Sequence, residues 1–176
     1  MANESWGIRG YARMMLRAII YSNPTGTAKI RSIYALPDRP ATIRKVLIVN
    51  DEPALLIKLE AVVRRVIGAA VLKIDPTNNV SIKQQVKRFI EEEAPDLILM
   101  DGNLGRPGSD RELTGKQLIH EMRAGGFKGY ILANSSDPVM NWEMTENGAD
   151  FAVNEGFNSR AKEKNLALFL KKHIIG

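Results

Sequence analysis

Residues 46–53 read VLIVNDEP, and this stretch decides the fold. Its first four residues are all apolar and mostly β-branched, which predicts a strand buried on both faces of a sheet. Strands of that kind belong to parallel sheets that carry helices on both sides. The acidic side chains of Asp51 and Glu52 then stand where the strand ends.

The rest of the chain alternates short apolar runs with longer amphipathic segments. We expect further strands at 70–74, 97–100, 130–133 and 149–153, and helices at 53–67, 82–93, 115–123, 137–147 and 160–175. Asp137 and Pro138 are a typical N-cap and first helical residue. Five successive βα units predict an α/β fold, a doubly wound five-stranded parallel sheet with helices on both faces.

Composition limits the class of protein. The chain has 176 residues, of which 44% are hydrophobic and 26% charged, as in ordinary globular domains. The lack of cysteine excludes a disulfide scaffold, a cysteine-ligated zinc site and thiol catalysis, and two histidines are too few for a histidine metal cluster. Because the sequence contains neither an apolar run of about 18 residues nor a signal peptide, we expect a soluble cytoplasmic protein.

Positive charge is concentrated at the start of the chain. The first 45 residues carry eight basic and two acidic side chains, whereas the remainder is nearly neutral. We therefore expect a basic N-terminal extension at 1–43 and a domain at 44–176. In the extension, Arg9, Arg13 and Arg17 would form one stripe of a helix. That stripe suits an anionic partner or a dimer contact; a solvated helix or a disordered extension is the alternative.

Polar residues follow the predicted strands at their carboxyl ends. Asp51 follows the first strand, Asp101 the third and Ser135 the fourth. In open parallel sheets, ligands bind beyond these ends. Clustered carboxylates with oxygen-only ligands favour Mg²⁺ or Ca²⁺, although each aspartate taken singly could also cap the following helix.

Three segments resemble the receiver domain of two-component response regulators. They are VLIVNDEP at 46–53, PDLILMDGNL at 95–104 and GAD at 148–150, and the resemblance extends over about 44–176. It implies a flavodoxin-like sheet with strand order 2-1-3-4-5. It also implies a signalling protein that is not an enzyme.

The resemblance implies roles for particular residues. Asp101 would accept a phosphoryl group from a histidine kinase or phosphotransfer protein. Mg²⁺ would be held by Asp51, Asp101 and the backbone carbonyl of Asn103, with Asn50 at the first acidic position of the family. Independently of the family, a carboxylate that attacks phosphorus needs the charge of the phosphoryl oxygens neutralised, which a divalent cation does.

The hydroxyl that senses phosphorylation in the family falls on Ser135, or on Asn134 or Ser136 if the register differs by one. Two positions depart from the family. Glu155 aligns with a lysine that pairs with the acceptor, and it would either repel the acceptor and the phosphoryl group or face away as a solvated loop residue. Asn50 removes one charge from the metal site.

Signalling would pass to a downstream protein through the predicted helix 137–147, the strand 149–153 and the helix 160–175, because no DNA-binding output domain is expected after them. Residues 105–112 lengthen the loop after the acceptor, so Arg106 or Arg111 could supply the missing positive charge, or the loop could be idle surface.

Three functions are compatible with the sequence. The first is a stand-alone phosphoacceptor that uses Asp101 with Mg²⁺. The second is a pseudo-receiver that acts as an interaction module without phosphorylation, which Asn50 and Glu155 favour. The third, a flavin- or nucleotide-binding protein, is disfavoured because no glycine-rich phosphate loop follows the first strand.

Overall fold

The computed structural model describes residues 42–105, 113–153 and 162–175. These residues form a five-stranded parallel sheet in the order β2-β1-β3-β4-β5. The strands are β1 (Lys45–Val49), β2 (Ala70–Lys73), β3 (Leu97–Met100), β4 (Tyr130–Ala133) and β5 (Phe151–Ala152). The predicted fold and strand order are confirmed.

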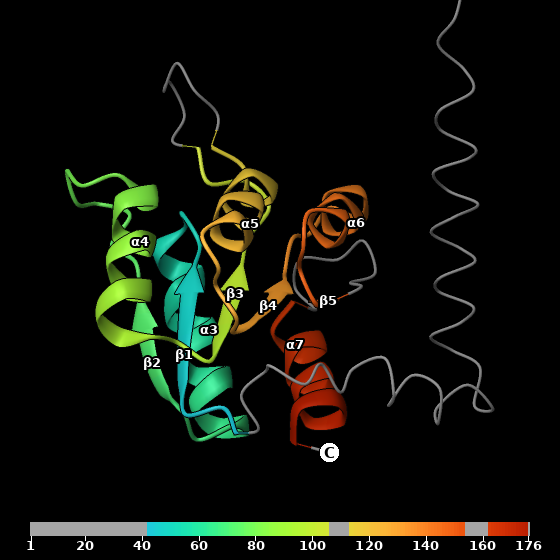
Figure 1. Ribbon diagram of the computed structural model, residues 1–176. Helices are drawn as coiled ribbons and strands as arrows, with labels where there is room; N and C mark the ends of the chain where they lie inside the picture. Colours follow the sequence, from blue (N-terminus) through green and yellow to red (C-terminus); the bar gives the residue numbers. More distant parts are fainter. Residues whose placement is uncertain (1–41, 106–112, 154–161, 176) are drawn as a thin grey trace, which may run out of the picture. The chain divides into compact units, whose positions relative to one another are not determined.

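Helices lie on both sides of this sheet (Figure 1). They are α3 (Pro53–Val66), α4 (Ile82–Glu93), α5 (Gly115–Ala124), α6 (Pro138–Glu146) and α7 (Lys162–Leu170), which continues into the π-helical turn η3 (Lys171–Ile175). Asp137 caps α6 as predicted, because its carboxylate accepts a hydrogen bond from the Val139 N–H at 2.9 Å. None of the helices in the described part of the chain has both the length and the apolar character of a membrane span.

The main core lies between one face of the sheet and helices α4, α5 and α6. Alternate residues of β1, β3 and β4 face this core: Leu47, Val49, Ile98, Met100, Ile131 and Ala133. The intervening residues are equally buried and face the side on which α3 packs against α7. Burial on both faces explains why the strand sequences are apolar at nearly every position.

The last strand is shorter than predicted. β5 contains only Phe151 and Ala152, not residues 149–153. The Ile131 N–H of β4 donates to the Asp150 carboxylate at 2.8 Å, so a side chain replaces a strand carbonyl at that point of the ladder. The predicted extension 1–43 lies almost wholly outside the described residues, as do Glu155 and the loop with Arg106 and Arg111.

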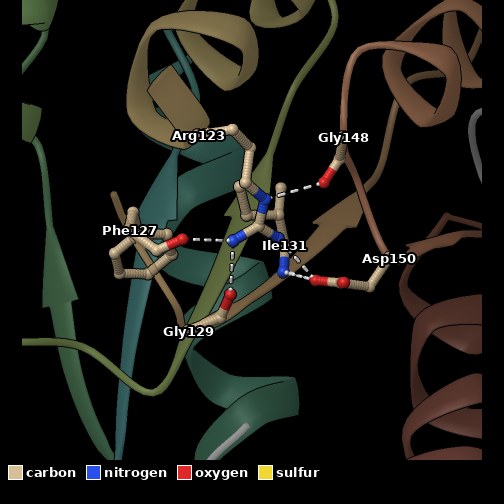
Figure 2. Close-up of polar contacts among 6 residues, drawn as sticks. All are labelled: Arg123, Phe127, Gly129, Ile131, Gly148 and Asp150. Atoms are coloured by element: carbon tan, nitrogen blue, oxygen red, sulfur yellow. Dashed lines mark hydrogen bonds and ion pairs between the residues drawn. The ribbon is translucent and has the colours of Figure 1, made fainter. Parts of the chain in front are cut away.

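The guanidinium of Arg123, which is only partly exposed, holds the start of β4 and the approach to β5 together (Figure 2). From the last turn of α5, it donates to the carbonyls of Phe127, Gly129 and Gly148 at 2.8–2.9 Å and to the Asp150 carboxylate at 2.7 Å. The side chains of Arg123 and Asp150 are 18% and 7% exposed. If one partner of such a charge pair is removed, the other charge is left largely buried and uncompensated, which destabilises the fold.

Replacing Arg123 by Met should therefore lower the free energy of unfolding by about 3 kcal/mol, because it removes the positive charge beside the Asp150 carboxylate and the donor to three carbonyls. Urea unfolding measures this change. The matched control is Lys87→Met, since the Lys87 side chain is 75% exposed in its pair with Glu91 and should contribute less than about 0.5 kcal/mol. Equal effects of the two changes would contradict this account of Arg123.

Candidate functional site

The register of three neighbouring strands places three polar residues in one row at the carboxyl edge of the sheet. Met100 of β3 is paired with Val49 of β1 and with Ala133 of β4. The next residue on each strand is therefore Asn50, Asp101 or Asn134, with Asp101 in the centre. We call Asn50, Asp101 and Asn134 the edge row.

Asn50 holds the Asp101 carboxylate directly. Its Nδ2 donates to Asp101 Oδ2 at 2.8 Å, and its Oδ1 accepts from the Glu52 N–H at 2.8 Å. These two bonds fix the orientation of an amide that is only 1% exposed. An aspartate at position 50 could accept from Glu52 in the same way, but it could not donate to Asp101.

Asp51 and Asn103 lie beside the edge row. Asp51 follows Asn50 and is half-buried. Asn103 forms an antiparallel bridge with Thr114, and the hydrogen bonds of that bridge are made by the flanking residues at 2.9 and 2.8 Å. The Asn103 carbonyl therefore points away from Thr114. This bridge closes the base of the loop whose middle lies outside the described residues.

Few charged side chains that could bind a metal ion lie near the edge row. The described residues contain no group of three or more His, Asp or Glu side chains that could hold a metal ion. The predicted donor set is smaller than such a group: the carboxylates of Asp51 and Asp101 and one backbone carbonyl. Two carboxylates with a carbonyl suit a hard divalent cation that keeps several of its waters.

Ser135 is buried, but its hydrogen bonds are directed toward α6. Its N–H donates to Asn141 Oδ1 at 2.8 Å, and its carbonyl accepts from Asn141 Nδ2 at 2.9 Å. Its Oγ accepts from the Asp137 N–H at 3.2 Å. Asn141 Nδ2 also donates to the Val153 carbonyl at 3.0 Å, which ties Ser135 to the end of β5.

Asn134 is the member of the edge row next to Asp101 on β4. Its backbone N–H donates to the Met100 carbonyl at 2.9 Å, and its side chain is 2% exposed. Among the described residues, nothing donates a hydrogen bond to its buried Oδ1. A buried acceptor without a partner is uncommon in native structures. Ser136, the third predicted position for the sensing hydroxyl, is exposed.

Two glycines allow α5 and α6 to approach the backbone around Asp101. A Cβ on Gly102 would lie 2.7 Å from Ser135 Oγ and would also overlap Met140 of α6. A Cβ on Gly115, the first residue of α5, would overlap the Asp101 carbonyl. The start of α5 therefore packs directly on the Asp101 carbonyl, and the Met140 side chain of α6 packs on Gly102, the residue after Asp101.

Sequence reasoning missed Asn141 and the two glycine contacts. Asn141 was expected to lie on a helix, and its buried amide could only have been recognised from the fold. The predictions for Asp51, Asp101 and Asn103 fall on residues that the structure brings to one edge of the sheet. Glu155, which the resemblance aligns with the lysine that pairs with the acceptor, lies outside the described residues.

Comparison with known proteins finds solved structures that share this fold. No family model and no curated protein matches the sequence. The chain is similar to the response regulatory domain of protein mrkE from Klebsiella pneumoniae, with a TM-score of 0.54 and 20% identity over 73% of this chain and 93% of that one. It is also similar to the response regulator domain of CheB from Thermotoga maritima, with a TM-score of 0.55 and 18% identity over 74% and 92%.

The described domain has the receiver fold. At identities of 18–20% the likeness is one of fold, so it confirms the architecture that the sequence resemblance implied. The edge row occupies the carboxyl edge of this receiver fold, where ligands bind in open parallel sheets.

Replacing Gly115 by Ala should lower the free energy of unfolding by about 2 kcal/mol, because the new methyl group overlaps the Asp101 carbonyl. The control is Gly125→Ala at the other end of α5, where φ is −75° and the nearest atom to the new Cβ is 3.3 Å away. We expect that change to stay within about 1 kcal/mol. Thermal or urea unfolding measures the stability of both variants, and equal stabilities would contradict the close contact at Gly115.

Proposed function

We propose that this chain is a response-regulator receiver that accepts a phosphoryl group on Asp101 with the help of Mg²⁺ and signals through protein contacts. One observation carries the proposal. In a receiver fold, Asp101 lies at the carboxyl edge of the central strand, oriented by Asn50, with a second carboxylate, Asp51, next to Asn50 in the chain.

The reaction needs an oriented carboxylate. A carboxylate oxygen of Asp101 attacks the phosphorus of a phosphohistidine on a kinase or phosphotransfer protein. A phosphorus–oxygen bond forms, the phosphorus–nitrogen bond breaks, and the released histidine nitrogen takes a proton from solvent. The Asn50 amide contributes by fixing the direction of the carboxylate before the donor arrives.

The proposed cation is Mg²⁺, which would be held by the carboxylates of Asp51 and Asp101 and the carbonyl of Asn103. When bound, it supplies neutralising charge for the phosphoryl oxygens. The side-chain oxygen of Asn50 already accepts from the Glu52 N–H. For that reason we assign Asn50 to the orientation of Asp101 and not to the first position of the metal site.

Signalling would pass to a downstream protein through α6, β5 and α7. Of these elements, α6 packs its Met140 side chain on Gly102, the residue after Asp101, so a change at Asp101 would act on α6 through this contact.

One observation favours a second candidate, a pseudo-receiver that binds its partner without phosphorylation. The Asn50 amide gives the Asp101 carboxylate a hydrogen-bond donor when no cation is bound. A module that only binds its partner would need this neutral hydrogen bond and no cation at Asp101. The first experiment below separates the two functions.

The intact protein, incubated with Mg²⁺ and a small-molecule phosphodonor, should gain one phosphoryl group that is stable in acid and labile in base. Mass spectrometry measures the gain. Asp101→Asn should gain none, because an amide is not a nucleophile toward phosphorus. Wild type that binds Mg²⁺ yet gains no phosphoryl group would favour the pseudo-receiver, and a phosphorylated Asp101→Asn would overturn the assignment of the acceptor.

The metal site is tested with two opposite changes. Asp51→Ala should abolish Mg²⁺ binding, and Asn50→Asp should tighten it, because the number of ligand charges tunes affinity for hard cations. Without Mg²⁺, Asn50→Asp should also lower the free energy of unfolding by about 1–2 kcal/mol, since it replaces the donor to Asp101 with a like charge. Added Mg²⁺ should restore that loss. Calorimetric binding and urea unfolding measure both effects, and unchanged binding in both variants would place the metal elsewhere.

A further inference from the structure

The segment that follows β2 lies at the same edge of the sheet as the edge row. The Ile74 N–H donates to the Ile48 carbonyl at 3.3 Å, which continues the ladder between β1 and β2 past its last paired residues. Asp75 is therefore level with Asn50. We call the segment 75–81, which leads from this point into α4, the edge loop (Figure 1).

The edge loop is exposed, yet hydrogen bonds hold it in one shape. Its residues from Thr77 to Ser81 are exposed, and Val80 is 40% exposed. Gln85 of α4 donates from Nε2 to the carbonyls of Asp75 and Val80 at 2.9 Å, and its Oε1 accepts from the Asp75 N–H at 2.7 Å. The Gln85 side chain lies in the interior, at 3% exposure. A loop that is ordered before a partner arrives loses less conformational entropy when the partner binds.

The Val80 side chain is the part of this loop that a partner can bind by hydrophobic contact. The Val80 N–H donates to Asn78 Oδ1 at 3.0 Å, and the Val80 carbonyl accepts from Gln85. Both backbone groups of Val80 therefore have partners, while its apolar side chain is exposed. Covering such a side chain with apolar surface gains free energy.

The distance from the edge loop to the acceptor is small compared with a protein interface. Neighbouring strands lie about 4.8 Å apart, and β2 is two places from β3, so the edge loop begins about 10 Å from the strand that Asp101 follows. A stable complex covers about 800 Å² on each partner, which corresponds to a patch of about 16 Å radius. A protein that brings a phosphohistidine to Asp101 and covers a patch of this size around it would also cover the edge loop.

We propose that the edge loop is a docking surface for the protein that donates the phosphoryl group, and that this protein places an apolar group on the Val80 side chain. This inference rests on the proposed function. A small phosphodonor needs no docking surface, so the edge loop should matter only when the donor is a protein. Gln85 is a positioning residue in this account, because it acts by holding the loop and not by touching the donor.

The test compares a protein donor with a small donor on the full-length protein with Mg²⁺. Histidine kinases of the source organism are autophosphorylated with ATP and mixed one at a time with wild type, the fastest donor is kept as the probe, and phosphoramidate is the small donor. Val80→Asp should slow transfer from the kinase about tenfold or more, because it puts a carboxylate into an apolar contact, and should stay within about twofold of wild type with phosphoramidate. The matched control is Leu168→Asp near the end of α7, at the opposite edge of the sheet (Figure 1), where the side chain is 57% exposed. It should change neither rate.

Gln85→Leu tests the positioning role. It removes the acceptor of the Asp75 N–H, so hydrogen exchange at that amide should become faster. A loosened loop should raise the KM for the kinase reaction more than it lowers kcat, and the rate with phosphoramidate should not change.

The inference is wrong if Val80→Asp and Leu168→Asp behave alike with the kinase, or if Val80→Asp slows both donors equally. It is also wrong if phosphoramidate phosphorylates wild type while no kinase does. In each of these cases the assignment of Asp101 as the acceptor still stands. Wild type that gains no phosphoryl group from either donor would overturn the proposed function and this inference with it.

Discussion

The parallel register of β1, β3 and β4 is the constraint on which the site depends. Because Val49, Met100 and Ala133 are aligned, the next residue of each strand falls into the edge row, with the Asp101 carboxylate between two asparagine amides. A slip of one residue on any strand would exchange the side chains packed on the two faces of the sheet, and it would move the polar residue at the end of that strand out of the row. The hydrophobic core therefore sets the register, and the register sets the site.

The two amides of the edge row differ in what they have bound. Asn50 uses both ends of its amide, one on Asp101 and one on the Glu52 N–H. Asn134 leaves its oxygen without a partner in the described part of the chain. A neutral donor at Asn50 holds the carboxylate without adding a like charge. The start of α5 packs on the Asp101 carbonyl at Gly115, and Met140 of α6 packs on Gly102.

The sequence predicted the parts of the molecule that depend on local pattern. The β1 and β3 runs are apolar at nearly every position because they are buried on both faces, and Asp51 and Asp101 stand out because they end such runs. The hydrogen bonds of Asn141 to Ser135 and Val153, and those of Arg123 to Asp150 and its neighbouring carbonyls, could not be predicted. Each set joins groups that only the fold brings together. The orientation of the Asn50 amide is likewise set by two partners, one of them across the sheet. β5 was predicted too long because a side-chain carboxylate replaces a strand carbonyl in its ladder.

The most direct measurement is a crystal structure of the wild-type protein grown with Mg²⁺ and beryllofluoride. The account predicts beryllium bonded to a carboxylate oxygen of Asp101 and Mg²⁺ between Asp51 and Asp101. Density for beryllium on another side chain, or none at Asp101 while Mg²⁺ is bound there, would contradict the claim that Asp101 is the phosphoacceptor.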